Sequence, residues 1–257
     1  MTALITGASS GIGRAFAHLF AKDGHALVLV ARRRAVLDEL AAELTRTYHV
    51  NVQVIACDLT NADAPSQLHA ALQQSGSVID VLVNNAGFGM QGAFAELPLD
   101  RQLQMIQLNV TALTTLTHLL LPSMIQRRSG GVLNVGSTAG FQPGPFMAAY
   151  YATKAYVVSF SEALSEELSG SGVRVTCLAP GPTATSFASE AGVTDSRLFR
   201  GGTMSADEVA RIGYEAWQHG KTLVIAGARN RFSAFIVRLA PRSSIRKVVR
   251  RLNTRAE

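Results

Sequence analysis

TGASSGIG, residues 6–13, follows directly on the apolar run 3–6 and precedes a helical pattern that begins at Gly13. Glycines let the backbone turn tightly and approach a bound pyrophosphate, and the free N–H groups of a helix N-terminus attract negative charge. A glycine-rich turn without a ligand is the alternative, and the position between the first strand and first helix of a β-α-β unit disfavours it. The stretch therefore predicts a nucleotide phosphate site made of Gly7, Ser9, Ser10, Gly11, Ile12 and Gly13.

Outward from this loop, short β-rich runs alternate with longer helical patterns. Strands are expected at 3–6, 26–31, 52–56, 78–83, 132–135, 173–178 and 223–226. Helices are expected at 13–22, 34–45, 64–74, 101–126, 150–168 and 206–218. Most of the strands are continuous apolar runs, which suits strands buried on both faces. The order predicts an α/β fold: one domain with a doubly wound parallel sheet of about seven strands, helices on both faces, and ligands at the carboxyl edge.

The end of the second strand bears on the choice of nucleotide. A site for NAD usually has Asp or Glu there to bind the adenosine ribose, whereas this chain has Ala31 followed by Arg32 and Arg33. The guanidinium fork suits a 2′-phosphate in charge and geometry. The alternative is a solvated, arginine-rich helix start, which we expect for Arg34. Arg32 and Arg33 therefore predict NADP(H) as the cofactor.

Tyr150 and Lys154 are four residues apart in a helical pattern and so share a face. A lysine ammonium beside a phenol favours the phenolate and lowers its pKa, which suits proton transfer to or from a carbonyl oxygen. Ser137 ends a strand at the same expected edge, where its hydroxyl could hold the substrate oxygen. Each residue alone has a purely structural explanation, but their combination predicts a catalytic site.

These motifs together resemble the short-chain dehydrogenase/reductase family, whose fold is Rossmann-like. They cover residues 1 to about 226 in the family's order, as TGASSGIG (6–13), CDL (57–59), NNAG (84–87), LNV (108–110), GS (136–137), YYATK (150–154) and PGPTAT (180–185).

The resemblance implies a role for each matching residue. Ser137, Tyr150 and Lys154 would be catalytic, with Tyr150 as acid/base, and Tyr150 and Lys154 would also contact the cofactor. Asn109 would hold a helix distortion and a water of the proton relay. The other implied cofactor contacts are Asp58 and Leu59 near the adenine, Asn85, Ala86 and Gly87 on the ribose side, and Pro180, Gly181, Thr183 and Thr185 around the nicotinamide.

The implied reaction is hydride transfer between NADP(H) and a carbonyl or secondary alcohol. One alternative is the same chemistry at a membrane surface, on a 3-oxoacyl group or a lipid ketone. A second alternative is a cofactor-sensing or scaffolding protein without turnover, against which the complete catalytic set argues.

Residues 186–204 correspond to the family's flexible substrate flap. Apolar side chains there and in nearby loops suggest a hydrophobic substrate, although each could simply pack the flap onto the body. The candidates are Phe187, Leu198, Phe199, Met204, Met90, Phe94, Phe141, Phe146 and Met147.

The basic charge of the chain is concentrated in its tail. Residues 229–257 hold nine of the 24 Lys and Arg residues and one of the 18 acidic residues, which leaves the catalytic segment 1–228 near neutrality. Apolar residues at helical spacing on either side of Pro241 predict two amphipathic helices. The tail is interpreted as packing on the body or on a second subunit of a homo-oligomer, with peripheral membrane contact as the alternative and nucleic acid disfavoured.

Other signals place limits on the class of protein. Cys57 and Cys177 lie in apolar runs and are interpreted as reduced structural thiols, and no Cys or His spacing predicts a metal site. The apolar run 113–121 is too short to span a bilayer, and no secretory leader is recognised at Met1. The resemblance favours a bacterial cytoplasmic enzyme, with the inner face of the membrane as a further location if the tail binds lipid.

Overall fold

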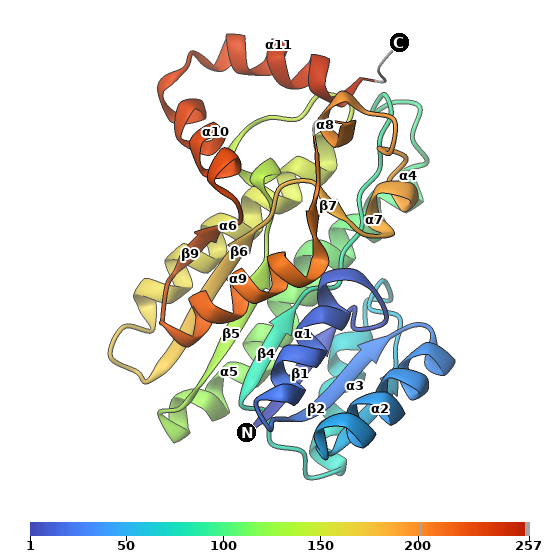
Figure 1. Ribbon diagram of the computed structural model, residues 1–257, viewed down its shortest axis with the longest axis vertical. Helices are drawn as coiled ribbons and strands as arrows, with labels where there is room; N and C mark the ends of the chain where they lie inside the picture. Colours follow the sequence, from blue (N-terminus) through green and yellow to red (C-terminus); the bar gives the residue numbers. More distant parts are fainter. Residues whose placement is uncertain (201, 255–257) are drawn as a thin grey trace.

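Seven parallel strands form one sheet in the order β3-β2-β1-β4-β5-β6-β9 (Figure 1). The computed structural model describes residues 1–200 and 202–254, so position 201 of the predicted flap and 255–257 of the predicted tail lie outside the described residues. The strands are β1 (Thr2–Thr6), β2 (Ala26–Ala31), β3 (Val52–Ala56), β4 (Val81–Asn84), β5 (Gly130–Val135), β6 (Val173–Ala179) and β9 (Leu223–Ile225). All seven predicted strands are present. β4 begins at Val81 rather than Val78, because Val78 is exposed in the loop ahead of the sheet.

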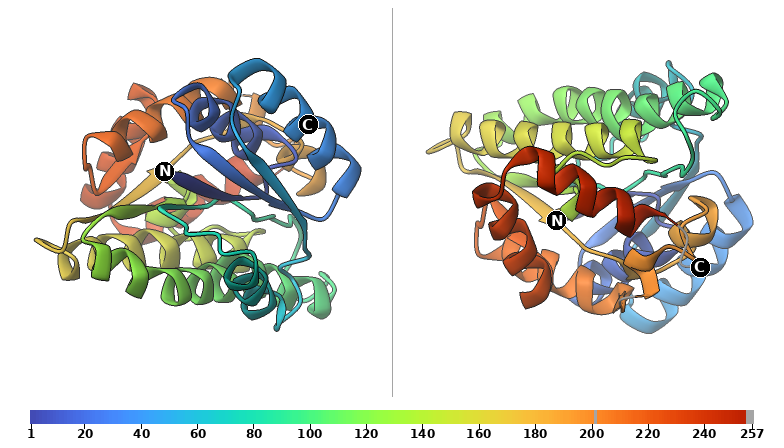
Figure 2. Two further views of the ribbon diagram at one scale, coloured as in Figure 1. Left: turned by 90° about the horizontal axis from the view of Figure 1, so that it is seen from below. Right: turned by 90° about the horizontal axis from the view of Figure 1, so that it is seen from above.

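Helices cover both faces of the sheet, as predicted (Figure 2). One face carries α1 (Gly11–Lys22), α2 (Arg34–Tyr48) and α9 (Ala206–Gln218). The other carries α3 (Ala64–Gln74), α5 (Leu113–Arg127) and α6 (Ala148–Glu167). Phe16 and Phe20 of α1 are completely buried on the first face, and Leu68 and Leu72 of α3 on the second. The apolar stripes of these helices thus enclose the sheet in a three-layer Rossmann-like fold.

One long helix combines three segments, α4 (Leu99–Ile106), a π-helical turn η1 (Gln107–Ala112) and α5. Among the described residues, it is the one helix long and apolar enough to cross a membrane by length and composition. It packs on α3, α6 and strands β4 and β5, so its apolar residues contribute to the helical layer of the domain. The sequence predicted one helix here, and the π-helical turn inside it contains Asn109.

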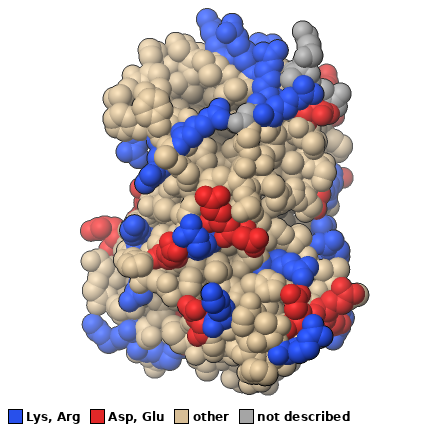
Figure 3. Space-filling model, viewed as in Figure 1, with Lys and Arg blue, Asp and Glu red and all other residues tan. Residues whose placement is uncertain are grey.

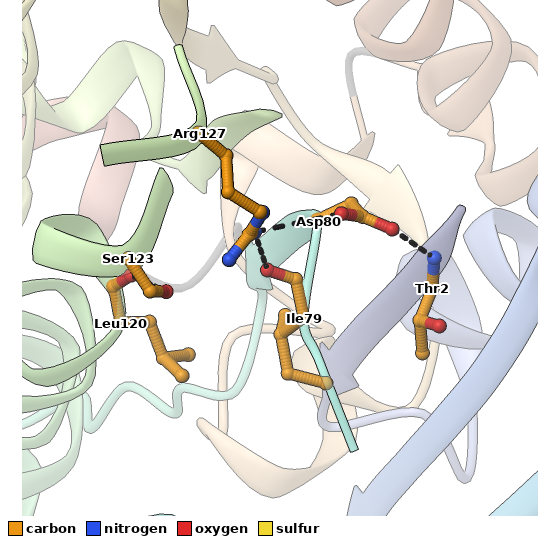
Figure 4. A network of polar contacts seen from close by, with 6 residues as sticks. All are labelled: Thr2, Ile79, Asp80, Leu120, Ser123 and Arg127. Carbon is orange, nitrogen blue, oxygen red and sulfur yellow. Dashed lines mark hydrogen bonds and ion pairs between the residues drawn. The ribbon is translucent and has the colours of Figure 1, made fainter. Parts of the chain in front are cut away.

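The amino ends of the strands are held together by a polar network (Figure 4). The backbone N–H of Thr2 donates to Asp80 Oδ2 at 2.7 Å, and Arg127 Nη2 donates to the carbonyl oxygen of Ile79 at 2.9 Å. This network joins β1, the loop before β4 and the end of α5. It stabilises the edge of the sheet opposite the carboxyl ends.

Apart from α9 and β9, the chain after β6 lies in the upper part of the molecule in Figure 1. Short elements come first: β7 (Thr183–Ala184), α7 (Phe187–Glu190), α8 (Arg197–Arg200) and β8 (Met204–Ser205). Two helices follow β9, as the tail sequence predicted, namely α10 (Ala228–Leu239) and α11 (Arg242–Asn253), separated at Pro241. Ile245 and Val249 of α11 are buried in an apolar cluster that includes Met105, Tyr150 and Tyr151. The tail therefore packs on the body of the same chain.

Candidate active site

A cavity of about 540 Å³ lies along the carboxyl ends of the strands. Its wall follows the strand ends from Gly7 after β1, past Arg32, Asp58 and Asn85, to Pro180 after β6. The order of the sheet reverses direction between β1 and β4, and open α/β sheets bind ligands at such a point. Every predicted cofactor-binding residue except Gly13 lines this cavity, and so do the predicted catalytic residues Ser137, Tyr150 and Lys154.

The loop between β1 and α1 has the backbone that the sequence predicted from its glycines. Gly7 and Gly11 have φ of +66° and +53°, in the left-handed region. A Cβ on Gly11 would lie 2.9 Å from Thr185 Cγ2. Ser10 precedes α1 without a side-chain capping bond, so the side chain leaves the first N–H groups of the helix available to an anion.

Gly13 lies behind the loop. A Cβ there would lie 2.3 Å from the carbonyl oxygen of Gly7 and 2.4 Å from Asn85 Nδ2, so glycine is needed for close packing. The loop is tied to the end of β4, because Asn85 Nδ2 donates to the carbonyl oxygen of Thr6 at 2.9 Å. Thr6 Oγ1 in turn accepts from the N–H groups of Asn85 and Ala86. These bonds, which the sequence did not reveal, fix the two strands where the sheet order reverses.

Both arginines at the end of β2 border the cavity. Arg33 Nη2 donates to Ser9 Oγ at 3.2 Å, which places its guanidinium over the loop between β1 and α1. Arg32 is exposed and also lines the cavity. Arg34 pairs with Asp38 at 3.5 Å on the surface of α2, as expected for a solvated helix start. Two basic residues therefore border the cavity at the end of β2.

The end of β3 presents Asp58 and Leu59 to the same region. Asp58 Oδ1 accepts hydrogen bonds from the backbone N–H of Thr60 at 3.0 Å and from its hydroxyl at 2.8 Å. This local turn fixes the carboxylate at the strand end. Thr60 also lines the cavity, a contact that the sequence reading missed.

Tyr150 and Ser137 meet at the inner end of the cavity. Both side chains are buried, and the Ser137 hydroxyl donates to the carbonyl oxygen of Pro180 at 3.5 Å and accepts from the backbone N–H of Ala139 at 3.1 Å. The Tyr150 ring packs against Phe187, with centroids 5.3 Å apart. Burial raises the pKa of Tyr150 well above its ordinary value, and the nearby Ser137 hydroxyl opposes that shift because it favours the phenolate. The phenol is therefore protonated at neutral pH, in the form that can donate a proton.

Lys154 lies one turn along α6 and is also buried. Its Nζ donates to the carbonyl oxygen of Val135 at 2.8 Å and lies 5.9 Å from the centroid of the Tyr150 ring. The predicted lowering of the Tyr150 pKa by this ammonium is wrong for this structure, because desolvation of the phenol dominates. Burial lowers the pKa of Lys154 itself to about 8.

We expect the lowered Lys154 pKa to make stability depend on pH. The unfolded lysine, with a pKa of 10.5, binds more protons between about pH 8 and 10.5 than the folded one, so the free energy of unfolding rises with pH there. As the pH rises through this interval, the free energy of unfolding of the wild type should increase by up to about 3 kcal/mol relative to that of Lys154→Met. Urea unfolding of both proteins measures the difference, and a difference that is constant with pH would contradict the assignment.

Asn109 lies outside the cavity wall, within the π-helical turn that the family resemblance implied as a helix distortion. Its Oδ1 accepts from the backbone N–H of Phe88 at 3.2 Å. Its Nδ2 donates to the carbonyl oxygen of Phe88 at 3.0 Å and to Thr153 Oγ1 at 3.1 Å. The side chain thus joins the loop after β4 to α6, next to Gly87. Its participation in a proton relay stays a prediction.

The substrate end of the cavity is apolar, but fewer residues form it than the sequence suggested. Four of the nine candidates line the cavity: Phe187, Leu198, Phe199 and Met147. Met90, Phe94 and Phe146 line, together with Met147, a small adjoining cavity of about 30 Å³ next to Tyr150. Met204 packs against the core below α9, and Phe141 packs near Val157, so both have structural roles.

Tyr151 and Asn253 form a contact that the sequence reading missed. Tyr151 lines the cavity beside Tyr150, and its hydroxyl donates to Asn253 Oδ1 at 3.1 Å. Asn253 Nδ2 donates to the carbonyl oxygen of Pro145 at 2.9 Å, and its own carbonyl oxygen accepts from Gln91. The last turn of α11 is therefore bonded to three segments around the site.

Comparisons with known proteins agree with this geometry. A family model described as short chain dehydrogenase matches residues 1–195. The chain is 41% identical over 215 residues to the sulfoacetaldehyde reductase of Chromohalobacter salexigens, which covers 80% of this chain and 83% of that protein. It is 40% identical over 176 residues to the very-long-chain 3-oxoacyl-CoA reductase of Laccaria bicolor, covering 67% of this chain. The matched part spans only 52% of that protein, and 60% of the corresponding reductase of Bos taurus.

A solved structure extends the likeness over the whole fold. The short-chain dehydrogenase from Sphingobium yanoikuyae in complex with NADPH superimposes with a TM-score of 0.83 at 36% identity, covering 96% of both chains. The fold, the family model and these relatives lead to one conclusion: the chain belongs to the short-chain dehydrogenase family.

Proposed function

We propose that this protein is an NADP(H)-dependent oxidoreductase that transfers a hydride between the nicotinamide and a carbonyl or secondary alcohol carbon. The observation that carries the proposal is that Ser137, Tyr150 and Lys154 line the same cavity as the glycine loop and the arginines after β2. A proton donor and a nucleotide site are thereby continuous, as a ternary-complex reaction requires.

The residues around the cavity fit a dinucleotide with a 2′-phosphate. Glycine at positions 7 and 11 lets the loop pack closely on Asn85 and Thr185, where a Cβ would collide, and the N-terminus of α1 suits the pyrophosphate. Arg32 and Arg33 suit the 2′-phosphate, while Asp58 and Leu59 would hold the adenine side. NADPH is bound in the Sphingobium relative, which supports the same cofactor here. When bound, the cofactor would supply the redox chemistry.

The side chains of the protein would supply binding, orientation and the proton. Tyr150, protonated because of its raised pKa, would donate a proton to the substrate oxygen in the reductive direction. Ser137 would orient that oxygen through its hydroxyl. Lys154, fixed by Val135, would hold the nicotinamide ribose with Tyr150, and its pKa of about 8 leaves it charged at neutral pH.

Arg32→Ala is expected to weaken NADPH binding by about tenfold or more, because a charge-assisted contact to phosphate contributes about 1.5–3 kcal/mol. NADH lacks the 2′-phosphate, so its dissociation constant should change little. Fluorescence titration with both nucleotides measures the two effects, and Arg34→Ala serves as the control because Arg34 pairs with Asp38 outside the cavity. Equal losses for NADPH and NADH would refute the 2′-phosphate assignment.

We propose a hydrophobic substrate, since Phe187, Leu198 and Phe199 line the cavity near Tyr150. A second candidate function is the reduction of 3-oxoacyl groups. It is supported by the similarity to very-long-chain 3-oxoacyl-CoA reductases and by the apolar cluster that surrounds Tyr150. The homo-oligomer and the cytoplasmic location stay predictions.

The first experiment is titration of the purified protein with NADPH and NADH, followed by a panel of ketones, aldehydes and 3-oxoacyl thioesters assayed for NADPH oxidation. Tight NADPH binding with turnover of apolar carbonyls would support the proposal, and preference for the thioesters would favour the second candidate. Binding without turnover across the panel would favour the sensing alternative. Failure to bind either nucleotide would refute the proposal.

A further inference from the structure

Helix α10 presents an apolar face to solvent. Phe232, Phe235, Ile236 and Leu239 are 66%, 57%, 42% and 69% exposed. Their spacing of three, four and seven residues places them in one stripe along the helix. Among the described residues of α10, Ala234 is the buried one, so the helix packs on the body through its other side. Four large apolar side chains on one stripe constitute a patch rather than scattered exposure.

Basic side chains surround this stripe. The exposed ones on α10 and α11 are Arg229, Arg231, Arg238, Arg242, Arg246, Lys247, Arg250 and Arg251. Figure 3 shows blue surface at the upper end of the molecule, where α10 and α11 lie in Figure 1, beside a broad uncharged area. The sequence from 229 to 256 contains no Asp or Glu. The patch therefore combines an apolar stripe with basic residues that no acidic residue of the same segment neutralises.

The patch is held on the body rather than on a free arm. Ile245 and Val249 of α11 are buried, and Asn253 bonds to Tyr151 and to Pro145. Because α11 is anchored in this way, α10 is fixed between β9 and α11 with its apolar stripe outward. No folding of the tail is needed before it binds a flat partner.

We propose that α10 and α11 form a docking surface for an anionic lipid bilayer. Large apolar side chains on one helix face, with lysine and arginine around them, are the composition of an interfacial helix. The basic residues would attract anionic headgroups while the two phenylalanines enter the acyl boundary. A second copy of the chain fits less well, because a symmetric α10–α10 contact would bring two basic tails together with no acidic partners between them.

The test uses the full chain and vesicles of phosphatidylcholine with about 30% phosphatidylglycerol, and vesicles of phosphatidylcholine alone. The wild type should sediment with the anionic vesicles, less with the neutral ones, and less at high salt. The double variant Phe232→Ser/Phe235→Ser should bind at least about tenfold more weakly. The matched control is Val78→Ser/Ile125→Ser, which removes side chains that are 55% and 40% exposed elsewhere and should bind like the wild type.

The fold of each variant is checked by NADPH titration and thermal melting, and Leu239→Asp replaces the double variant if that protein does not fold. Equal vesicle binding by the wild type and the α10 variant, or no binding by the wild type, would overturn the proposal. If the wild type does not bind vesicles and the α10 variant has half the molecular mass of the wild type in solution, the partner of the stripe is a second copy of the chain. That result would also overturn the proposal. These outcomes are independent of hydride transfer, which the carbonyl assay measures separately.

Discussion

Replacing Tyr150 with phenylalanine is expected to lower kcat by about 10³-fold for any ketone that the wild type reduces, because general acid catalysis contributes about 10²–10⁴-fold. The substitution removes one oxygen, and the ring can still pack against Phe187 and Tyr151. The glycine loop, Arg32, Arg33 and Lys154, which would make the other contacts to the nucleotide, are unchanged. NADPH should therefore bind with nearly the dissociation constant of the wild type, and steady-state kinetics with fluorescence titration separates the two effects.

Tyr156→Phe is the matched control for that experiment. Tyr156 lies on the same helix, is partly exposed, and its hydroxyl bonds to Thr114 rather than facing the cavity. Its loss should leave kcat and NADPH binding close to those of the wild type. A Tyr150→Phe protein that keeps more than about a tenth of the wild-type rate would rule out the proton-donor role.

Asn253→Ala is expected to release α11 from the body. The substitution removes the bonds to the Tyr151 hydroxyl and the Pro145 carbonyl and leaves a buried hydroxyl unpaired, at a cost of about 3 kcal/mol in local stability. That cost raises the equilibrium for opening of the tail by about 10²-fold. Trypsin cleaves after arginine and lysine, which are frequent in α11, so cleavage of the native protein under limiting protease should accelerate by a similar factor.

The same variant should also affect substrate binding. Tyr151 lines the cavity, so loss of its partner is expected to raise KM for an apolar ketone more than it lowers kcat. Ser243→Ala, at an exposed position at the start of α11, is the control and should change neither cleavage nor kinetics. If Asn253→Ala and the control are cleaved at equal rates, the bonds of Asn253 do not hold the helix.

Much of the fold could be predicted because local and tertiary signals agree. The strands β2 and β3 begin and end where their apolar runs do, and the glycines of residues 6–13 mark the turn into α1. Ligand-facing residues follow the strand ends because parallel strands bring these ends to one edge. Position along the chain was therefore enough to place Arg32, Asp58 and Ser137 around one cavity.

The remaining features depend on contacts between distant segments. Tyr151 and Asn253 are separated by 102 positions, and nothing in either local sequence indicates that they meet. The periodicity of the tail predicted its two helices, but not that Ile245 and Val249 are buried while the stripe of α10 is exposed. The direction of the Tyr150 pKa shift also required the structure, since it depends on how deeply the folded chain buries the phenol.

The π-helical turn Gln107–Ala112 determines how the helix would respond to the loss of one codon. A π turn holds one residue more than an α-helical turn, so this segment is one residue longer than a regular helix through it would be. Deletion of one codon within this turn would restore a regular helix and keep the buried faces of α4 and α5 in phase. It would also turn Asn109 away from Phe88 and Thr153, so a gene that lost this codon would still encode the fold but not the connection between the loop after β4 and α6.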